Sequence, residues 1–230
     1  MSSFLSDSMF FGVVVSLIGY QFGMILKKKF KNPIFNPLLI SIVFVILILL
    51  MCNVEYKNYN EGAKYISYLL TPATVCLALP LYQQMELLKR NAKAISIGVV
   101  AGVVSALGSV LILAKLFGLD HREYVTLLPK SITTAIGMGI SEELGGIVTI
   151  TVAVIIITGV LGNIVGEAVC KVFRIKQPIA KGLALGTAAH AIGTARAMEM
   201  GEVEGAMSSL AIAVAGLLTV VGAAIFSHFM

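Results

Sequence analysis

Long apolar segments alternate with short polar ones along almost the whole chain. The apolar segments run over residues 9–26, 34–52, 65–88, 94–117, 147–170 and 204–228. A helix needs about 20 residues to cross about 30 Å of hydrocarbon, because it rises about 1.5 Å per residue. Each segment is therefore predicted to span a membrane. The first is included because its lysine cluster follows it, whereas a signal peptide carries its positive charge in front.

Three hydrophobic stretches carry interruptions that an ordinary spanning helix lacks. Residues 129–140 are too short to cross, residues 178–201 are only weakly hydrophobic, and residues 65–88 contain internal prolines. The expected helix breaks are at Pro72, Pro80 and Pro129, because proline removes a backbone donor and disfavours helical geometry before it. In lipid, the freed backbone groups must be satisfied by protein or by a water-filled cavity. The three stretches are therefore predicted to line one shared polar cavity.

A gapless shift of 114 residues aligns two parts of the chain. It places "VAGVVSALGSVL" (100–111) over "VAGLLTVVGAAI" (214–225), and residues 71–84 over 185–198. At this shift the basic loops fall on acidic or neutral loops, so positive-inside orientation puts each loop and its mate on opposite sides. That pattern is typical of an inverted-topology repeat, a common plan of secondary transporters.

The expected fold class is therefore an all-α polytopic membrane protein with broken or re-entrant helices. It would be a single transmembrane domain over residues 1–230, with repeat one at about 1–117 and repeat two at about 118–230. If residues 129–140 dip in and return on the outer side, every basic cluster faces the cytoplasm. About seven crossings result, with the N-terminus outside and the C-terminus inside.

Composition supports a membrane location. Hydrophobic residues make up 58% of the chain and charged residues 13%, whereas a soluble domain has about 25% charged residues. The net charge of +5 does not indicate a nucleic-acid partner, because the basic residues lie in loop clusters. The three cysteines, Cys52, Cys76 and Cys170, are far apart in apolar segments and are expected to be free thiols.

Ionisable residues inside a membrane segment are costly and usually have a function or a partner. At helical spacing, Thr187, His190 and Thr194 share one face, which favours contact with a substrate or a proton. The alternative is a histidine that is hydrogen-bonded to a carbonyl for packing.

Two further cationic groups are candidates for binding an anion. Arg196 would clamp a carboxylate, but it also lies three residues from Glu199 and would pair with it on a helix. Glu199 and His190 are the candidates for proton coupling. Lys130 follows Pro129 at a predicted helix N-terminus, where free N–H groups favour anions; alternatively it reaches the membrane interface. Neighbouring hydroxyls would contact the same ligand: Ser131, Thr133 and Thr134.

Polar residues of the 65–88 segment provide weaker candidates for the cavity wall, namely Thr71, Thr74 and Gln84. No phosphate-binding glycine loop, metal-spaced cluster or activated nucleophile is present in the sequence. We therefore expect neither an enzyme nor a protein with a metal or cofactor.

Three motifs in order resemble the LrgB/CidB family of bacterial membrane proteins. They are "LTPATVCLALPLYQQ", "LPKSITTAIGMGISEELGG" and "GLALGTAAHAIGTARAMEMGEVEGAMSSLA", and the likeness covers about residues 64–228. Members of the family often have a proline after the paired threonines, where this chain has Ala135.

The resemblance implies two functions. Bacterial members are described as antiholin-like or holin-like proteins of the cell membrane, which act with a small LrgA/CidA partner on murein hydrolase activity and cytolysis. A plant relative that contains an LrgB-like half is the plastid glycolate/glycerate translocator. The first hypothesis is therefore a secondary transporter of small monocarboxylates such as glycolate, glycerate, lactate or pyruvate. The second is a non-transporting regulatory subunit. The sequence leaves homo-oligomerisation open.

Overall fold

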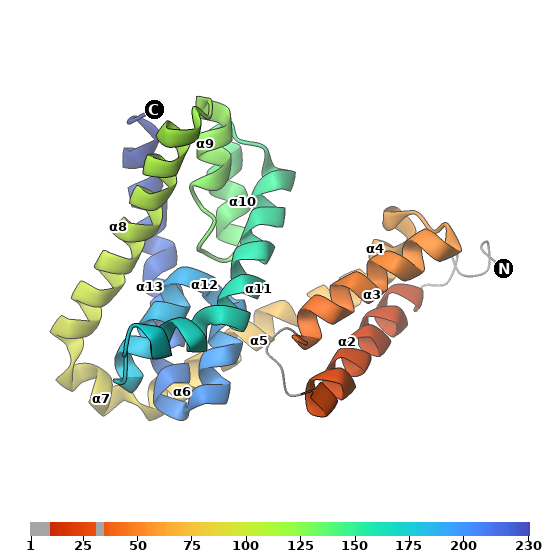
Figure 1. Cartoon of the computed structure of the whole chain (residues 1–230), viewed down its shortest axis with the longest axis horizontal. Coiled ribbons are helices and arrows are strands. Elements are labelled where there is room, and N and C mark those ends of the chain that lie inside the picture. The colour runs from red at the N-terminus through yellow and green to blue at the C-terminus, as the bar shows by residue number, and fades with distance from the viewer. Residues whose placement is uncertain (1–9, 31–34) are drawn as a thin grey trace. The chain divides into compact units, whose positions relative to one another are not determined.

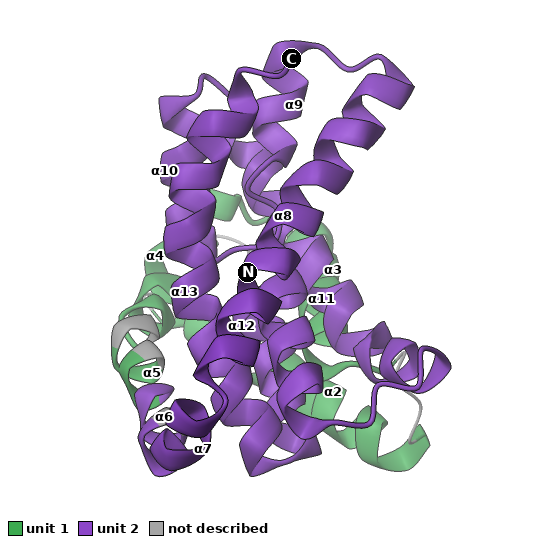
Figure 2. Cartoon of the chain, turned by 90° about the vertical axis from the view of Figure 1, so that its left-hand side faces the viewer, with its two compact units in different colours: residues 1–76 green, residues 77–230 purple. Residues whose placement is uncertain are grey.

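In the computed structural model, the described residues are 10–30 and 35–230, without the side chains of Leu70, Thr71, Thr74 and Leu81. Every regular element among them is a helix, as the hydrophobic pattern predicts. The chain divides into two compact units, residues 1–76 and residues 77–230 (Figure 2). This boundary differs from the expected repeat boundary near residue 117.

Four helices are long and apolar enough to cross a membrane within the part that the structure describes. They are α2 (Phe11–Phe30), α8 (Ala92–Phe117), α11 (Val148–Val172) and α13 (Glu202–Ser227). The apolar helix α3 (Pro37–Cys52) is shorter. The chain is thus an all-helical multi-pass membrane protein, although four long spans are fewer than the seven expected crossings.

Unit 1 is built around the packing of α2 against α3 and α4 (Tyr56–Ser67). Gly19 and Gly23 of α2 lie directly against α3, so a methyl group at either position would clash. The Ser16 hydroxyl is 2.7 Å from the Tyr59 hydroxyl of α4. Asn36 caps the start of α3, since its side chain accepts the backbone N–H groups of Leu38 and Leu39.

The proline-containing segment is broken, as predicted. It forms three short helices instead of one spanning helix: α5 (Leu70–Cys76), α6 (Ala78–Gln83) and α7 (Met85–Arg90). Pro72 and Pro80 each occupy the first turn of their helix, where a proline is tolerated because that N–H has no helical partner.

The core of unit 2 joins α8, α13 and α9 (His121–Leu127). Residues of α8 three or four apart form its buried stripe: Ile95, Val99, Val103, Leu107, Val110 and Ala114. At the far end of the core, the Tyr124 hydroxyl of α9 donates to the Phe226 carbonyl of α13 at 2.9 Å. Figure 1 shows this end at the top, beside the C-terminus.

The helix α9 and the helix α10 (Thr134–Glu143) form a re-entrant hairpin. Its tip spans residues 128–133, and both arms lie in the upper half of unit 2 in Figures 1 and 2. The dip that the sequence predicts for residues 129–140 is therefore present.

The helix α12 (Pro178–Met200) is a second re-entrant hairpin. Its backbone is non-helical at Ala189 and at His190, whose φ is +42°. Before the break, Gly182 lies against Met207, and Gly186 lies against Ala211, so this arm runs in the same direction as α13.

After the break, the second arm runs back. Thr194 hydrogen-bonds Ser208, and Met198 lies against Gly205, so this arm and α13 have opposite directions. The interrupted stretch 178–201 is therefore a hairpin and not one continuous helix. The helix turns back because contacts with α11 and α13 hold its centre, and no proline or glycine marks that position.

This geometry also decides the directions of α8 and α13. Along the first arm of α12, Gly98 lies against Leu183 and Gly102 against Thr187, so this arm is parallel to α8 as well. Both α8 and α13 therefore run toward the C-terminal end, as Figure 1 shows. The 114-residue shift aligns these two helices and requires them to be opposed, so the structure does not support an inverted repeat at that register.

Candidate functional site

The tip of the α9–α10 hairpin carries the cationic candidate Lys130. Pro129 ends the helical path of α9, and the Lys130 N–H donates to the Leu127 carbonyl at 3.1 Å, which closes a tight turn. The Lys130 Nζ donates to the Ser131 hydroxyl at 3.1 Å. The tip thus presents one positive charge and one hydroxyl together.

A cavity of about 840 Å³ lies between α8, the first arm of α12 and this tip. Its lining residues are Asn91, Ala94, Gly98, Gly102, Ser105, Ala106, Lys130, Ser131, Gln177, Ile179, Ala180, Leu183, Ala184, Thr187 and Ala188. Small side chains form most of the wall, which leaves room for a ligand. Lys130 is the only ionisable residue among these lining residues.

Ser131 and Thr187 contribute hydroxyls to this cavity from the two hairpins. Each is only 6% exposed, and Thr187 donates to the Leu183 carbonyl of its own helix at 2.8 Å. From the two hairpins, a bound group would therefore meet one cation and two hydroxyl oxygens. This set suits a small anion, because a charge-assisted hydrogen bond is stronger than a neutral one and an apolar wall strengthens it further.

The other residues of the predicted threonine–histidine face do not line the cavity. His190 is 3% exposed and its Nε2 donates to the Ile155 carbonyl at 3.0 Å. Thr194 is 1% exposed and its hydroxyl lies 3.0 Å from the His190 carbonyl and 2.7 Å from the Ser208 hydroxyl. The break at Ala189 separates these side chains from Thr187, so the single face expected from helical spacing is not formed. His190 has the carbonyl partner that a packing role requires.

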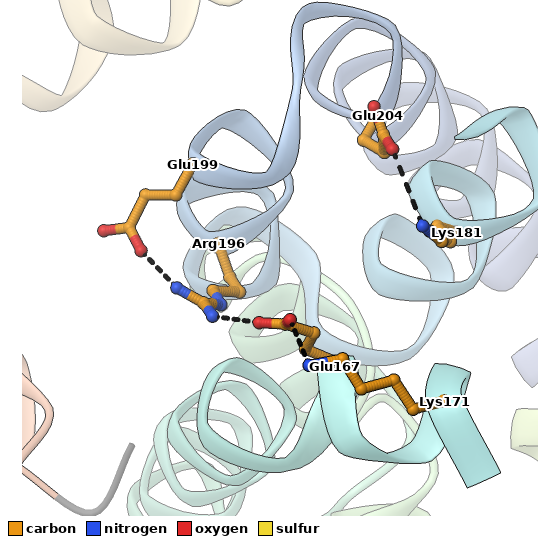
Figure 3. A network of polar contacts seen from close by, with 6 residues as sticks. All are labelled: Glu167, Lys171, Lys181, Arg196, Glu199 and Glu204. Carbon is orange, nitrogen blue, oxygen red and sulfur yellow. Dashed lines mark hydrogen bonds and ion pairs between the residues drawn. The ribbon is translucent and has the colours of Figure 1, made fainter. Parts of the chain in front are cut away.

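Arg196 and Glu199 lie in a separate ionic network. Arg196 binds Glu167 of α11 through one nitrogen and Glu199 through the other, the latter at 2.6 Å (Figure 3). Glu167 also pairs with Lys171 at 2.8 Å. A second pair, Lys181 and Glu204, joins α12 to α13 at 4.0 Å. Arg196 thus has two carboxylate partners within the protein.

This network borders its own cavity of about 530 Å³. The lining residues are Glu167, Cys170, Lys171, Arg174, Ile175, Lys176, Lys181, Arg196, Glu199 and Met200. Lys130 and Arg196 therefore line different cavities, and the one shared polar cavity expected from sequence is divided.

Gln84, Thr133 and Thr134 are not among the residues that line the Lys130 cavity. Gln84 lines a third, smaller cavity of about 150 Å³ near the start of α13. Thr133 is the N-cap residue of α10, although its side chain makes no capping hydrogen bond, and Thr134 begins that helix. The side chains of Thr71 and Thr74 lie outside the described residues.

Three features of the two cavities and of the α12 break were not predicted from the sequence. Glu167 is an acidic residue inside an apolar segment, so the rule that identified Arg196 also applies to it. Asn163 donates to the Ile192 carbonyl at 2.8 Å and thereby satisfies a backbone group near the α12 break. The small wall of α8 was visible as spaced glycines, but close helix packing explains such glycines equally well.

Among the described residues, no three His, Cys, Asp or Glu side chains are grouped so that they could hold a metal ion. The three cysteines are free thiols; Cys170 is buried, Cys52 is half-buried and Cys76 is exposed.

Comparisons with known proteins agree on one family. The profile of the LrgB-like family matches residues 16–229. Proteins named antiholin-like protein LrgB from Bacillus mycoides, Bacillus cereus and Bacillus anthracis are 45% identical over 222 residues, which is 96% of this chain and 96% of each relative. No solved structure matches the chain.

Proposed function

The chain belongs to the LrgB-like family of antiholin-like membrane proteins, and from that premise we propose that it is a secondary transporter of small monocarboxylates. The supporting observation is the cavity that ends at Lys130, where this cation and the hydroxyls of Ser131 and Thr187 lie among small side chains. A carboxylate would pair with Lys130, and a 2-hydroxyl group would bond Ser131 or Thr187. Glycolate, glycerate and lactate carry both groups.

The position of the cavity also supports transport. Asn91 and Gln177 line it near the basic segments before α8 and after α11, and its opposite end is the tip of a hairpin that enters from the other side. Basic segments stay in the cytoplasm, so this end would face the cytoplasm of a bacterial cell. Re-entrant backbone at membrane depth is a feature of transporters, where it lines a binding site.

Arg196 has a different role in this proposal. Its two carboxylate partners already neutralise it, so it would hold the second arm of α12 to α11 instead of binding substrate. Breaking a partly exposed ion pair of this kind changes stability by at most about 1 kcal/mol.

The test is uptake of labelled glycolate, glycerate, lactate and pyruvate by proteoliposomes. We expect Lys130→Met to lower uptake of the preferred acid by about 10- to 100-fold, the value of one charge-assisted hydrogen bond of about 1.5–3 kcal/mol. Lys115→Met is the matched control, because Lys115 is exposed at the other end of α8. Equal uptake by the Lys130 and Lys115 variants would refute the assignment of the site.

A second function is supported by the names of the relatives. As an antiholin-like regulatory subunit, the protein would bind a small LrgA/CidA-type membrane partner and thereby affect murein hydrolase activity and cytolysis. Wild-type protein that binds such a partner but transports none of the four acids would favour this function.

A further inference from the structure

The two re-entrant hairpins are related by a second, shorter sequence shift. Moving the chain by 56 residues places "SITTAIG" (131–137) over "TAAHAIG" (187–193), and Glu143 over Glu199. The identical Ala-Ile-Gly follows the tip in each hairpin. The shift also aligns Ser131 with Thr187, which are the hydroxyls that the two hairpins contribute to the Lys130 cavity.

The tertiary structure agrees with this register, unlike the 114-residue one. The 56-residue shift aligns residues 92–143 with residues 148–199, so α8 corresponds to α11 and the α9–α10 hairpin corresponds to α12. In each pair the directions are opposed. The helix α8 runs toward the C-terminal end and α11 runs away from it, while the hairpins enter from opposite ends (Figures 1 and 2).

The 56-residue shift also identifies the position that corresponds to the Lys130 cavity in the other half. The cavity lies between α8 and the first arm of α12, so its counterpart lies between α11 and α9. There the Thr151 hydroxyl of α11 is 2.8 Å from the Thr126 carbonyl and 2.7 Å from the Ser141 hydroxyl. The Ile147 N–H donates to the Thr126 hydroxyl at 2.8 Å.

These polar contacts have no equivalent on the cavity side. The counterparts of Thr126 and Ser141 are Gly182 and Ala197, and the counterpart of Thr151 is Ile95, none of which has a polar side chain. The contact between α9 and α11 is therefore closed by buried hydroxyls, whereas the corresponding region between α8 and the first arm of α12 is an open cavity. Such asymmetry between equivalent halves is what one state of an alternating-access protein requires.

We propose that residues 92–143 and 148–199 are inverted halves of one transport unit, and that the Thr126–Ser141–Thr151 contact is the gate that closes the outward counterpart of the Lys130 cavity. The inference rests on the proposed transport function. Ser131 and Thr187 are then equivalent substrate contacts on the two tips, reached from one side at a time.

Cysteine accessibility tests the gate without any substrate. The native cysteines Cys52, Cys76 and Cys170 are first replaced by alanine. Reporters are Val154→Cys, the counterpart of Gly98, and Ser105→Cys in the Lys130 cavity. A membrane-impermeant maleimide is added to either side of oriented vesicles. We expect Ser105→Cys to react from the cytoplasmic side only, and Val154→Cys to react slowly from both.

Opening the gate should change the labelling of Val154→Cys and leave that of Ser105→Cys unchanged. Thr151→Val keeps the side-chain shape but removes the hydroxyl, and should raise labelling of Val154→Cys from the outer side about fivefold. Ser141→Ala tests the same contact if the first variant folds poorly. Ser209→Ala is the matched control, because that buried hydroxyl bonds only the Gly205 carbonyl of its own helix. Ser209→Ala should leave the rate of Val154→Cys labelling unchanged.

Unchanged labelling in both gate variants, or an increase from the cytoplasmic side, would overturn the gate. Failure of the transport function is a separate result, because it would appear as absent uptake by wild-type protein. Retained uptake with an unchanged labelling pattern would show that the protein transports without this gate.

Discussion

The two re-entrant hairpins of unit 2 reach the membrane interior by different means. The α9–α10 hairpin has a proline at its tip and a turn of six residues, and it contributes Lys130 to the cavity. The α12 hairpin turns within two residues at Ala189 and His190, without proline or glycine. A helix therefore reverses either because its sequence cannot continue it or because its surroundings hold a strained bend.

The glycines of the two hairpins are not equally close to the neighbouring helices. The first arm of α12 presses against α13 through glycines: a methyl group at Gly186 would lie 2.7 Å from the Ala211 Cβ. On α10, a methyl group at Gly139 would meet no atom within 4 Å. Gly137 of α10 also lies directly against Ile155 of α11, so the first hairpin is closely packed there and open at Gly139.

The largest expected effect compares these two glycines. Gly186→Val should lower the free energy of unfolding by about 3 kcal/mol, because the added carbons overlap α13. Gly139→Ala should keep or raise stability, since alanine is a better helix former by about 1 kcal/mol. Thermal unfolding of the detergent-purified variants measures both. A similar loss of stability at both positions would show that Gly139 is packed as closely as Gly186.

A second test concerns His190, the histidine at the tip of the α12 hairpin. His190→Ala should destabilise the protein by about 2 kcal/mol, because it removes a buried side chain together with its hydrogen bond to the Ile155 carbonyl. His190→Gln places an amide nitrogen near the same position and should recover most of the loss. If His190 couples protons, His190→Gln would instead fold normally and lose uptake driven by a pH gradient.

Thr194→Val sharpens the same comparison at a smaller scale. It removes the hydroxyl that joins the α12 hairpin to Ser208 of α13, and should cost about 1 kcal/mol. The matched change on the first hairpin is Thr133→Val, where no capping hydrogen bond is lost. We expect less than about 0.5 kcal/mol there. Equal losses of stability in the two variants would contradict the view that the α12 hairpin is held more strongly by its side-chain hydrogen bonds.

The smallest effect belongs to the Lys181–Glu204 pair. Its atoms are 4.0 Å apart and Lys181 is partly exposed, so Lys181→Ala should change stability by less than about 0.5 kcal/mol. A chemical-denaturation midpoint that is unchanged within error would agree. A loss above about 1 kcal/mol would assign this pair an unexpected part in holding α12 to α13.

Hydrophobic segments were predicted well because their signal is local. Residues 94–117 and 147–170 closely match α8 and α11, and the interruptions at Pro72, Pro80 and Pro129 coincide with breaks. The break in α12 was expected only as weak hydrophobicity. Its place and its reversal depend on Ile155, Asn163 and Ser208, which are distant in the sequence.

The sequence predicted the residue types of the candidate site but placed them all in one shared cavity. Lys130, Ser131 and Thr187 do share a cavity. Arg196 lies elsewhere because Glu167, on another helix, pairs with it. No spacing within residues 178–201 indicates that partner.

The sequence by itself determined that this chain is a helical membrane protein of the LrgB-like family, where its helices lie and which segments are interrupted. Those properties follow from side-chain hydrophobicity and from prolines, which act on the nearest few residues. Only the tertiary structure decided that α12 turns back, that α8 and α13 are parallel, and that Lys130 and Arg196 border different cavities. Each of these depends on which distant groups satisfy a backbone carbonyl or a charge away from water, and that choice is made by packing.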